Sequence, residues 1–240
     1  MEWETTIPAD QLLGVGLYTP SEAAQFARVR PQQLLRWIHG SRRGHPVVTA
    51  QFQGHREIVS FLDMIQALAI REMRYRKRVP LGRIREAVDF LQNRHPEIKY
   101  PFARQHSTYI IEREKHIAIA LPGEDPECLY RVSGRHHGQL VHAKILDEYL
   151  SELEFGGDNL ARRFVPMSIG SRRIVLDPEV RFGQPRVEPS GHLVQTLVGA
   201  YEAEGSTKAV AWWYDIGEAD VRIALRYQGS LAGPVNAKAS

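Results

Sequence analysis

The stretch TPSEAAQFARVRPQQLLRWIHGSRR, Thr19–Arg43, predicts two short helices that fold back on each other. Its first four residues indicate a helix start. Thr19 is suited to cap the helix, Pro20 fits the first helical position, and Glu22 completes a capping box. The residues that follow are small and mostly apolar, so a second helix is able to approach this one closely.

The second helix of this stretch begins at Pro31 and ends at Gly40. Two helices joined by a turn of about four residues form a helix-turn-helix. This second helix is therefore either a reader of DNA or the outer half of a packed hairpin. Its apolar residues predict one buried stripe, made of Leu34, Leu35 and Ile38, and its polar residues Gln32, Gln33 and Arg36 lie off that stripe.

Arg30 stands where a helix normally carries a capping residue. Ser, Thr and Asp are favoured there because their side chains accept a backbone hydrogen bond, which an arginine side chain cannot do. The positive charge of Arg30 also opposes the helix dipole, although Gln33 is able to reach back to the cap amide. A phosphate bound at this helix end would remove both penalties.

The segment after the second helix predicts a basic β-wing. Val47–Val48 and Glu57–Val59 have the composition of short strands, with Gly54 at the turn between them. A wing of this kind follows the phosphates while the second helix enters the major groove. Basic residues crowd the segment, namely Arg42, Arg43, His45, His55 and Arg56.

Charge is distributed unevenly along the 240 residues. Between Ser21 and Tyr100 there are 15 lysine and arginine residues and 7 acidic residues, a balance of +8, whereas the whole chain carries +3. A basic N-terminal third on a near-neutral remainder is typical of nucleic-acid binding, and the alternative is an arginine-rich solvated surface. Apolar residues make up 43% of the chain, which excludes wholesale disorder.

The residues expected to meet DNA follow from these positions. Gln32, Gln33 and Arg36 are expected at the bases or in the groove, because glutamine pairs bidentately with adenine and arginine with guanine. Trp37 stays open between packing against the wing and contact with DNA. The expected phosphate contacts are Arg30, Arg42, Arg43, His55 and Arg56.

Two further amphipathic helices follow, the first capped by Ser60 and the second stopped before His95. This order of helix, turn, helix, wing and helix resembles the DNA-binding domain of MerR-type regulators over roughly residues 15–95. The resemblance implies binding to double-stranded DNA, commonly as a homodimer because half-sites repeat about one helical turn apart. The matching residues are Thr19–Ala24, the turn Val29–Pro31, Leu34–Trp37, Gly54 and Arg56.

The middle of the chain is predicted to hold a β-hairpin and a helix. The hairpin strands are expected at Tyr109–Ile111 and Ile117–Ala120, and the helix over Gln139–Phe155. The sequence around Gly156 then indicates a joint before the C-terminal third.

Metal binding and catalysis are not expected from the residues that suggest them. His136, His137 and His142 cluster, but adjacent histidines seldom hold one ion, and no cysteine or carboxylate falls at zinc-site spacing. Cys128, the single cysteine, has no basic or histidine neighbour that would make it a nucleophile. The chain also has no glycine-rich phosphate loop or serine elbow, so no cofactor, no metal and no enzyme activity is expected.

The C-terminal third predicts short strands followed by three helices. Strands are expected at Phe164–Val165 and Ile174–Leu176. Gly205 is expected to end the first helix and Ser206 to cap the second. The cluster Trp212–Tyr214 is either an interface for a partner or, for its middle residue, part of the core.

The order of these residues resembles a small antitoxin domain that is found with PIN-domain toxins. The resemblance rests on Ile174, Asp177–Pro178, Phe182–Pro185, Gly205–Ser206, Tyr214, Asp220–Val221 and Ala224–Leu225. The family often has Gly-Thr-Arg after the Gly-x-Pro turn, where this chain has Glu188-Pro189-Ser190-Gly191. With the N-terminal domain included, the chain resembles the long VapB-type antitoxins of mycobacteria over most of residues 15–230.

This resemblance implies an antitoxin that binds its own promoter and neutralises a PIN-domain ribonuclease. Arginine pairs well with the carboxylates of such a toxin's metal site, and Arg222 and Arg226 are candidates for that contact. The alternatives are a MerR-like regulator that senses a small molecule and a scaffold that binds only proteins.

The expected fold is α+β and mainly helical. Three domains are predicted: a winged helix-turn-helix over residues 1–95, a β-hairpin and helix over 96–158, and a C-terminal three-helix unit with short strands over 159–240. The chain has no run of about 18 apolar residues that would span a membrane. Its N-terminus also lacks the features of a secretory signal, so a cytoplasmic protein is expected.

Overall fold

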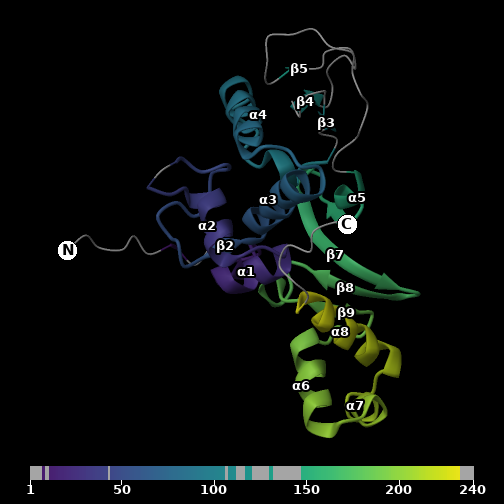
Figure 1. Cartoon of the computed structure of the whole chain (residues 1–240). Coiled ribbons are helices and arrows are strands. Elements are labelled where there is room, and N and C mark those ends of the chain that lie inside the picture. The colour runs from purple at the N-terminus through teal and green to yellow at the C-terminus, as the bar shows by residue number, and fades with distance from the viewer. Residues whose placement is uncertain are drawn as a thin grey trace, which may run out of the picture. The chain divides into compact units, whose positions relative to one another are not determined.

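The computed structural model describes residues 7–8, 11–42, 44–105, 108–111, 117–120, 130–131 and 147–232. The fold is α+β, as predicted, with helices beside short antiparallel sheets (Figure 1). The chain divides into two compact units. The N-terminal unit runs from Tyr18 to Ala161, and the C-terminal unit holds residues 162–232 with the described residues before Tyr18. The three domains expected over 1–95, 96–158 and 159–240 remain predictions.

The N-terminal unit begins with the predicted pair of helices, α1 (Pro20–Ala27) and α2 (Pro31–His39), after the short strand β1 (Leu17–Tyr18). The capping box forms, because the Thr19 hydroxyl accepts from the Glu22 amide at 3.3 Å and the Glu22 carboxylate accepts from the Thr19 amide at 2.8 Å. The chain turns at Arg28, which is left-handed with φ of 53°. The buried face of α1 is made of Ala23, Ala24, Phe26 and Ala27.

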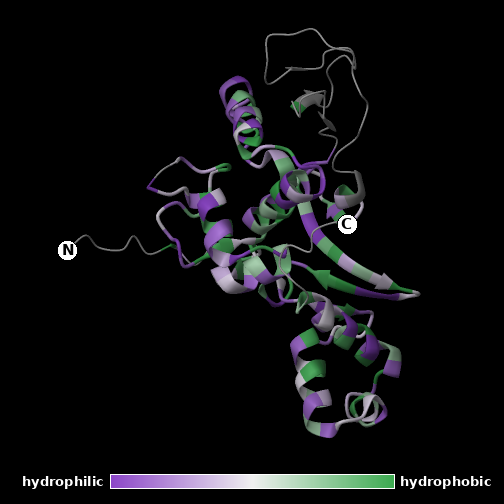
Figure 2. Ribbon diagram, in the orientation of Figure 1, coloured by the Kyte–Doolittle hydropathy of each residue, from purple (hydrophilic) through white to green (hydrophobic). Residues whose placement is uncertain are grey.

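The core of this unit is built around α3 (Phe61–Arg71), which follows β2 (Val59–Ser60). Ser60 caps α3 as predicted, accepting from the Asp63 amide at 3.1 Å. Both α1 and α2 pack against α3, which Figure 2 colours largely as hydrophobic. The chain continues through a π-helical segment, η2 (Glu72–Arg76), into α4 (Leu81–Arg94) and the 3-10 turn η3 (Pro101–Ala103).

The predicted wing strands are not found. Residues 45–58 form turns and irregular backbone, and Val59 belongs to β2. Val47 and Val48 are buried, and their amides both donate to the Trp37 carbonyl, at 2.7 and 3.2 Å. These amides are therefore taken by the end of α2 instead of by a partner strand, so the segment is a loop tied to the helix.

The predicted central hairpin is confirmed as β3 (Thr108–Ile111) paired antiparallel with β4 (Ile117–Ala120), and β5 (Tyr130–Arg131) adds a third strand. The helix predicted over Gln139–Phe155 is wrong at its end. The helix α5 (Asp147–Leu150) stops early and β6 (Leu153–Phe155) follows, while residues 139–146 lie outside the described ranges.

The C-terminal unit contains the predicted strands as β7 (Ala161–Ile169) and β8 (Arg172–Leu176), joined by a tight turn, with β9 (Arg186–Glu188) pairing on the other side of β8. The β7–β8 register shifts between Phe164 and Met167. Pro166 lies in that interval, and proline is tolerated at such bulges because it has no amide to donate. Ile174, Val175, Leu176 and Val187 are fully buried in this sheet.

Three helices complete the C-terminal unit (Figure 1): α6 (Val194–Glu204), α7 (Thr207–Trp213) and α8 (Glu218–Leu231). As predicted, Gly205 ends α6 with φ of 68°, and Ser206 caps α7 by accepting from the Ala209 amide at 3.3 Å. Arg172 of β8 holds the buried carboxylate of Asp220 at 2.8 Å, which links the sheet to α8. Within the described ranges, the structure has no helix long and apolar enough to cross a membrane.

Candidate nucleic-acid interface

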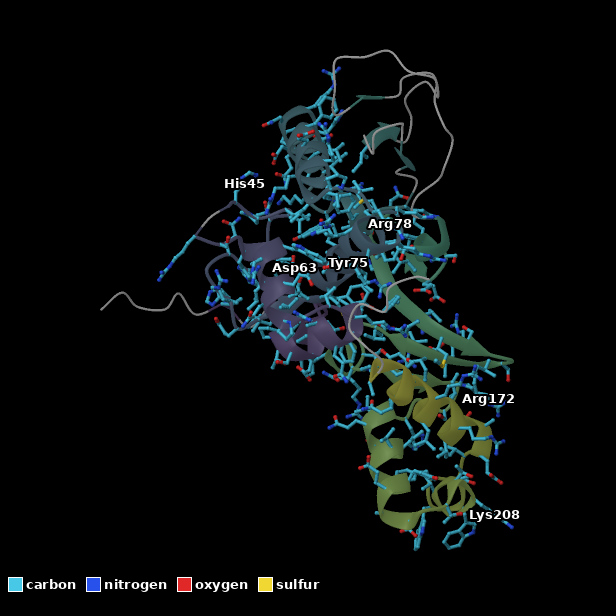
Figure 3. The ribbon with its side chains drawn as sticks, viewed as in Figure 1. His45, Asp63, Tyr75, Arg78, Arg172 and Lys208 are labelled. Atoms are coloured by element: carbon cyan, nitrogen blue, oxygen red, sulfur yellow. The ribbon has the colours of Figure 1, made fainter. Side chains whose placement is uncertain are left out.

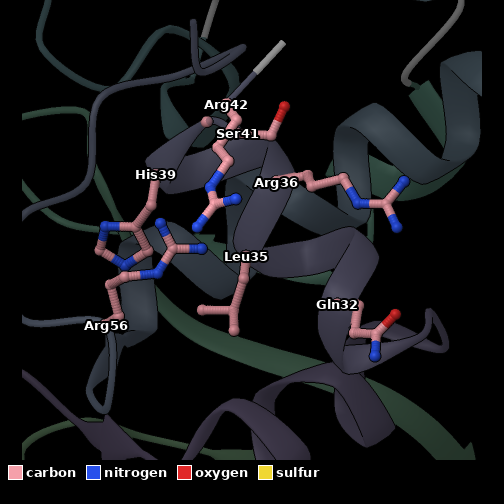
Figure 4. A pocket seen from close by; sticks show the side chains of 8 residues that line it. Gln32, Leu35, Arg36, His39, Ser41, Arg42 and Arg56 are labelled. Atoms are coloured by element: carbon pink, nitrogen blue, oxygen red, sulfur yellow. The ribbon is translucent and has the colours of Figure 1, made fainter. Parts of the chain in front are cut away.

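An open cavity of about 610 Å³ lies between α2 and the loop that follows it. Figure 4 shows Gln32 and Arg36 projecting from α2 and Arg42 and Arg56 approaching from the loop. Three of its lining side chains are arginines and none is acidic. The cavity therefore suits an anionic ligand. Its lining residues are Gln32, Leu35, Arg36, His39, Gly40, Ser41, Arg42 and Arg56.

The sequence of α2 separates a polar face from a buried one. Gln32 and Arg36 are exposed and lie one helical turn apart, so they share a face. The opposite side of α2 is buried through Leu34, Trp37 and Ile38. Because the buried side fixes how the helix is rotated, Gln32 and Arg36 are held on the exposed face of α2 that borders the cavity.

Gly40 permits the sharp turn that brings Arg42 to the cavity. Its φ is 74°, and an added Cβ would lie 2.9 Å from the Gly44 carbonyl oxygen, so only glycine fits. Ser41 and Gly44 then exchange backbone hydrogen bonds at 2.8 and 3.2 Å. Arg42 is exposed in this short turn.

A buried carboxylate anchors the part of the loop that leads to Arg56. The two carboxylate oxygens of Asp63 accept from the Gln51 amide at 3.1 and 3.2 Å. Asp63, labelled in Figure 3, is 1% exposed. Burial raises the pKa of Asp63 to about 6, although hydrogen bonds from Gln51 and Ser60 act to lower it.

His39 contributes a second titratable group to the cavity. Burial and the charge of Arg56 lower the pKa of His39, while Glu57 acts to raise it. Burial and Arg56 therefore both favour the neutral form of the ring. Its Nε2 atom is buried without a hydrogen-bond partner among the described residues. An anion in the cavity would favour the protonated ring, because opposite charges at short range stabilise each other.

Four of the nine predicted DNA-contact residues line the cavity: Gln32, Arg36, Arg42 and Arg56. Arg30 lies outside it, exposed at the N-cap of α2, and makes no side-chain cap hydrogen bond, as its residue type led us to expect. His55 bonds Glu57 at 3.0 Å and does not line the cavity. Arg43 lies outside the described residues.

Gln33 and Trp37 occupy the side of α2 that meets η2. The Gln33 amide nitrogen donates to the hydroxyl of Tyr75 and so does not reach back to the cap amide as expected. Trp37 is only 2% exposed, and its ring lies 6.5 Å from that of Tyr75. Of its two interpretations, packing is the one that this burial supports.

Sequence reasoning missed three of the residues that shape the site. His39 follows Arg36 by three positions, so helical spacing was a signal that placed it on the same face. Asp63 was hidden because its partner, the Gln51 amide, lies twelve residues away in an irregular loop. Tyr75 lies 42 residues from Gln33, and no local pattern indicates that contact.

The predicted toxin-contact residues lie on α8. Arg222 is exposed and pairs with Glu218 at 3.0 Å, and Arg226 is exposed. The tryptophans of α7 differ from an ordinary core pair, because Trp212 is 73% and Trp213 is 64% exposed. Their rings meet edge to face at 4.8 Å. The core interpretation of Trp213 is therefore wrong, and the pair forms an exposed aromatic patch on α7.

The remaining chemistry-bearing residues of the sequence do not add a site. In the described ranges, no group of three or more His, Cys, Asp or Glu residues is placed to hold a metal ion. His136, His137, His142 and Cys128 lie outside those ranges.

The chain is similar to known proteins along most of its length. Over 225 residues it is 28% identical to "Putative antitoxin VapB45" of Mycobacterium tuberculosis. The aligned region covers 88% of this chain and 93% of that protein. The X-ray crystal structure of Rv2018 from Mycobacterium tuberculosis matches with a TM-score of 0.61 at 24% identity, over 89% of this chain and 98% of that one. The second likeness supports the α+β fold.

A family model described as "Protein of unknown function (DUF433)" matches residues 174–228. That range runs from β8 to α8. The matched residues therefore belong to the C-terminal unit, whereas the similarity to the Mycobacterium tuberculosis proteins extends over both units.

Proposed function

We propose that this protein is the antitoxin of a type II toxin–antitoxin pair. It neutralises a PIN-domain ribonuclease and represses its own operon by binding promoter DNA. The similarity to an antitoxin over 88% of the chain supports the first role. The cationic cavity beside α2 is the single observation that carries the second.

The DNA-binding role rests on what the cavity offers a duplex. Arg36 and Gln32 project from α2 as donors for base edges, in the way that a recognition helix meets the major groove. Arg42 and Arg56 lie beside α2 and would contact the phosphates. Arg30 makes no side-chain cap bond, and Pro31 has no N–H. The Gln33 amide donates to the Arg30 carbonyl, so the Gln32 amide is the one in the first turn of α2 that is left for a further phosphate.

The toxin is assigned to the C-terminal unit. Trp212 and Trp213 present an exposed aromatic patch, and tryptophans are the residues most often found to dominate the binding energy of protein interfaces. Arg222 and Arg226 of the same unit supply guanidinium groups for toxin carboxylates. We further propose a homodimer in the cytoplasm, because promoters read by a helix-turn-helix carry two half-sites.

Co-expression with the product of the neighbouring reading frame tests the antitoxin role. Rescue of growth and a co-purifying complex are the expected results. If the neighbour is not toxic and no complex forms, the antitoxin role is wrong. Promoter binding that then responds to a small molecule would support the alternative, a MerR-like ligand-sensing regulator.

Mobility shifts on the chain's own promoter test the DNA role separately. Arg36→Ala is expected to weaken the specific complex while the fold is retained. Arg83→Ala is the matched control, because it removes an equal charge from α4 of the same unit and Arg83 does not line the cavity. Unchanged binding by Arg36→Ala would show that Arg36 does not read the bases.

A further inference from the structure

We infer that Tyr75 positions Gln33 and thereby sets the base preference of α2 at one position of the DNA site. This inference rests on the proposed DNA-binding function. It adds a residue from outside the helix-turn-helix to the machinery that reads sequence.

The contact between the two side chains joins α2 to the segment that follows α3. The Gln33 amide nitrogen donates to the Tyr75 hydroxyl oxygen. The Tyr75 ring also lies beside the buried Trp37 ring, with centroids 6.5 Å apart and planes inclined by 38°. Tyr75, labelled in Figure 3, is nevertheless 38% exposed. Its ring is therefore fixed from one side while its hydroxyl lies at the surface.

The π-helical geometry of η2 holds Tyr75 in this place. The Lys77 amide donates to the Glu72 carbonyl, five residues back, at 3.1 Å. Glu72 and Met73 are buried beneath the segment, and the carboxylate of Glu72 is paired with Arg76 at 3.2 Å. A π-turn alters the direction of the side chains that follow it, and such turns are frequent at functional sites. The segment η2, which carries Tyr75, is thus held in place at both of its ends.

The chemistry of the glutamine amide explains what Tyr75 adds. Gln33 has two N–H donors and one carbonyl acceptor, and the tyrosine oxygen takes one of those donors. Recognition of adenine needs one donor and one acceptor, and both remain. Gln33 lies in the first turn of α2 and is partly exposed, and the N-terminal residues of a recognition helix meet the base edges.

Holding the amide in one orientation before binding reduces the entropy that binding loses. A free glutamine side chain samples many rotamers, and ordering it on DNA lowers affinity. Tyr75 orders Gln33 in the unbound protein. The effect is confined to the base that Gln33 meets, because the arginines of the cavity do not depend on this hydrogen bond.

The test is selection of preferred duplexes from a random-sequence DNA library by the full-length chain. Three variants are compared with the wild type: Tyr75→Phe, Gln33→Ala and the double variant. Phe keeps the ring against Trp37 and removes only the hydroxyl. Tyr201→Phe is the matched control, because it removes a partly exposed hydroxyl from α6 of the other unit.

Tyr75→Phe is expected to relax the preference at a single base position and to weaken binding to the selected site about three- to tenfold, the range set by one hydrogen bond. Gln33→Ala should relax the same position, and the double variant should lose little more than either single one. Affinity for unselected duplex and its salt dependence should not change.

Three results would overturn the inference. Tyr75→Phe selecting the wild-type motif with unchanged affinity would remove the specificity role. Equal weakening on all duplexes would indicate a structural role alone. If the wild-type chain enriches no sequence and binds no duplex, the proposed DNA function itself fails, and this outcome is distinct from the other two.

Discussion

The short helices α1 and α2 of the N-terminal unit and α6 and α7 of the C-terminal unit begin and end with the same kinds of capping residue. The side chains on their exposed faces differ in chemistry. In the N-terminal unit, Thr19 caps α1 and a glycine ends α2; in the C-terminal unit, Ser206 caps α7 and a glycine ends α6. The exposed face of α2 carries Gln32 and Arg36 beside two further arginines. The exposed face of α7 carries two tryptophans.

Charge divides the two groups in the same way. Residues 194–231, which hold α6–α8, have three basic and five acidic side chains, whereas residues 21–100 have fifteen and seven. Phosphate attracts the basic composition of residues 21–100 and repels the acidic composition of residues 194–231. The surface chemistry, more than the helical arrangement, is the ground for our proposal that one unit binds nucleic acid and the other binds protein.

The largest expected effect comes from removing the aromatic patch. Trp212→Ala and Trp213→Ala should each weaken the toxin complex by about 2–4 kcal/mol, because truncating a buried interface tryptophan removes a large contact area. Binding to promoter DNA should not change. Titration calorimetry with the purified toxin measures the first quantity and mobility shifts the second.

Ile169→Ala is the control for this pair, since it truncates another exposed apolar side chain of the C-terminal unit. Its toxin affinity should match the wild type. If both tryptophan variants keep full toxin affinity, the assignment of the two surfaces fails on the protein side.

One carboxylate in each unit, Asp63 and Glu188, should respond to acid in opposite directions. Asp63 has its pKa raised from 3.8 to about 6, so the folded N-terminal unit binds a proton more tightly than the unfolded chain. The stabilisation that protonated Asp63 gives this unit, about 3 kcal/mol at pH 4, should be lost as the pH rises through 6. Asp63→Asn should abolish that loss and stabilise α3 at neutral pH. Hydrogen exchange of the α3 amides against pH measures it.

Glu188 supplies the opposing case in the C-terminal unit. Burial acts to raise the pKa of Glu188, but the hydrogen bond from Arg173 and the charges of Arg163 and Arg186 outweigh it and lower the pKa below 4.5. The stabilisation that Glu188 contributes is present above that value and is lost as the pH falls through the lowered pKa.

If protection of the α3 amides from hydrogen exchange rises as the pH goes from 4 to 7 in the wild type, the Asp63 assignment is contradicted.

A smaller effect is expected at the bases. Arg36→Ala should weaken binding to the promoter by about 1–3 kcal/mol, the range for one bidentate arginine–guanine contact. Toxin binding should stay at the wild-type level. This variant should therefore lose DNA affinity and keep toxin affinity, whereas the tryptophan variants should lose toxin affinity and keep DNA affinity. Mobility shifts on promoter and unrelated duplex measure the loss, with Arg83→Ala as the control.

Local signals in the sequence were sufficient for much of the fold. The capping box at Thr19, the cap at Ser60 and the Gly205–Ser206 junction were each predicted, because a cap depends on residues within one turn of it. The hairpin of β3 and β4 was predicted from two apolar runs separated by a polar loop.

Contacts between distant residues account for the features that the sequence did not indicate. The Trp37 carbonyl takes the amides of Val47 and Val48, so a segment with strand composition becomes a loop. Tyr149 donates to the Ile65 carbonyl, 84 residues away, at 2.7 Å. The exposure of Trp213 is a third case, since an apolar pattern on a short helix does not tell which apolar residue is left uncovered.

The smallest expected effect separates a phosphate contact from a base contact within the cavity. Arg56→Gln should weaken promoter and unrelated duplex alike and reduce the slope of log affinity against log salt by about one, because one fewer phosphate is neutralised. Lys208→Gln removes one charge from α7 (Figure 3) and should leave the slope unchanged. Equal slopes for wild type and Arg56→Gln would mean that Arg56 does not touch the backbone. A reduced slope for Lys208→Gln would place DNA on the C-terminal unit too, and the division between the two surfaces would then fail on the nucleic-acid side.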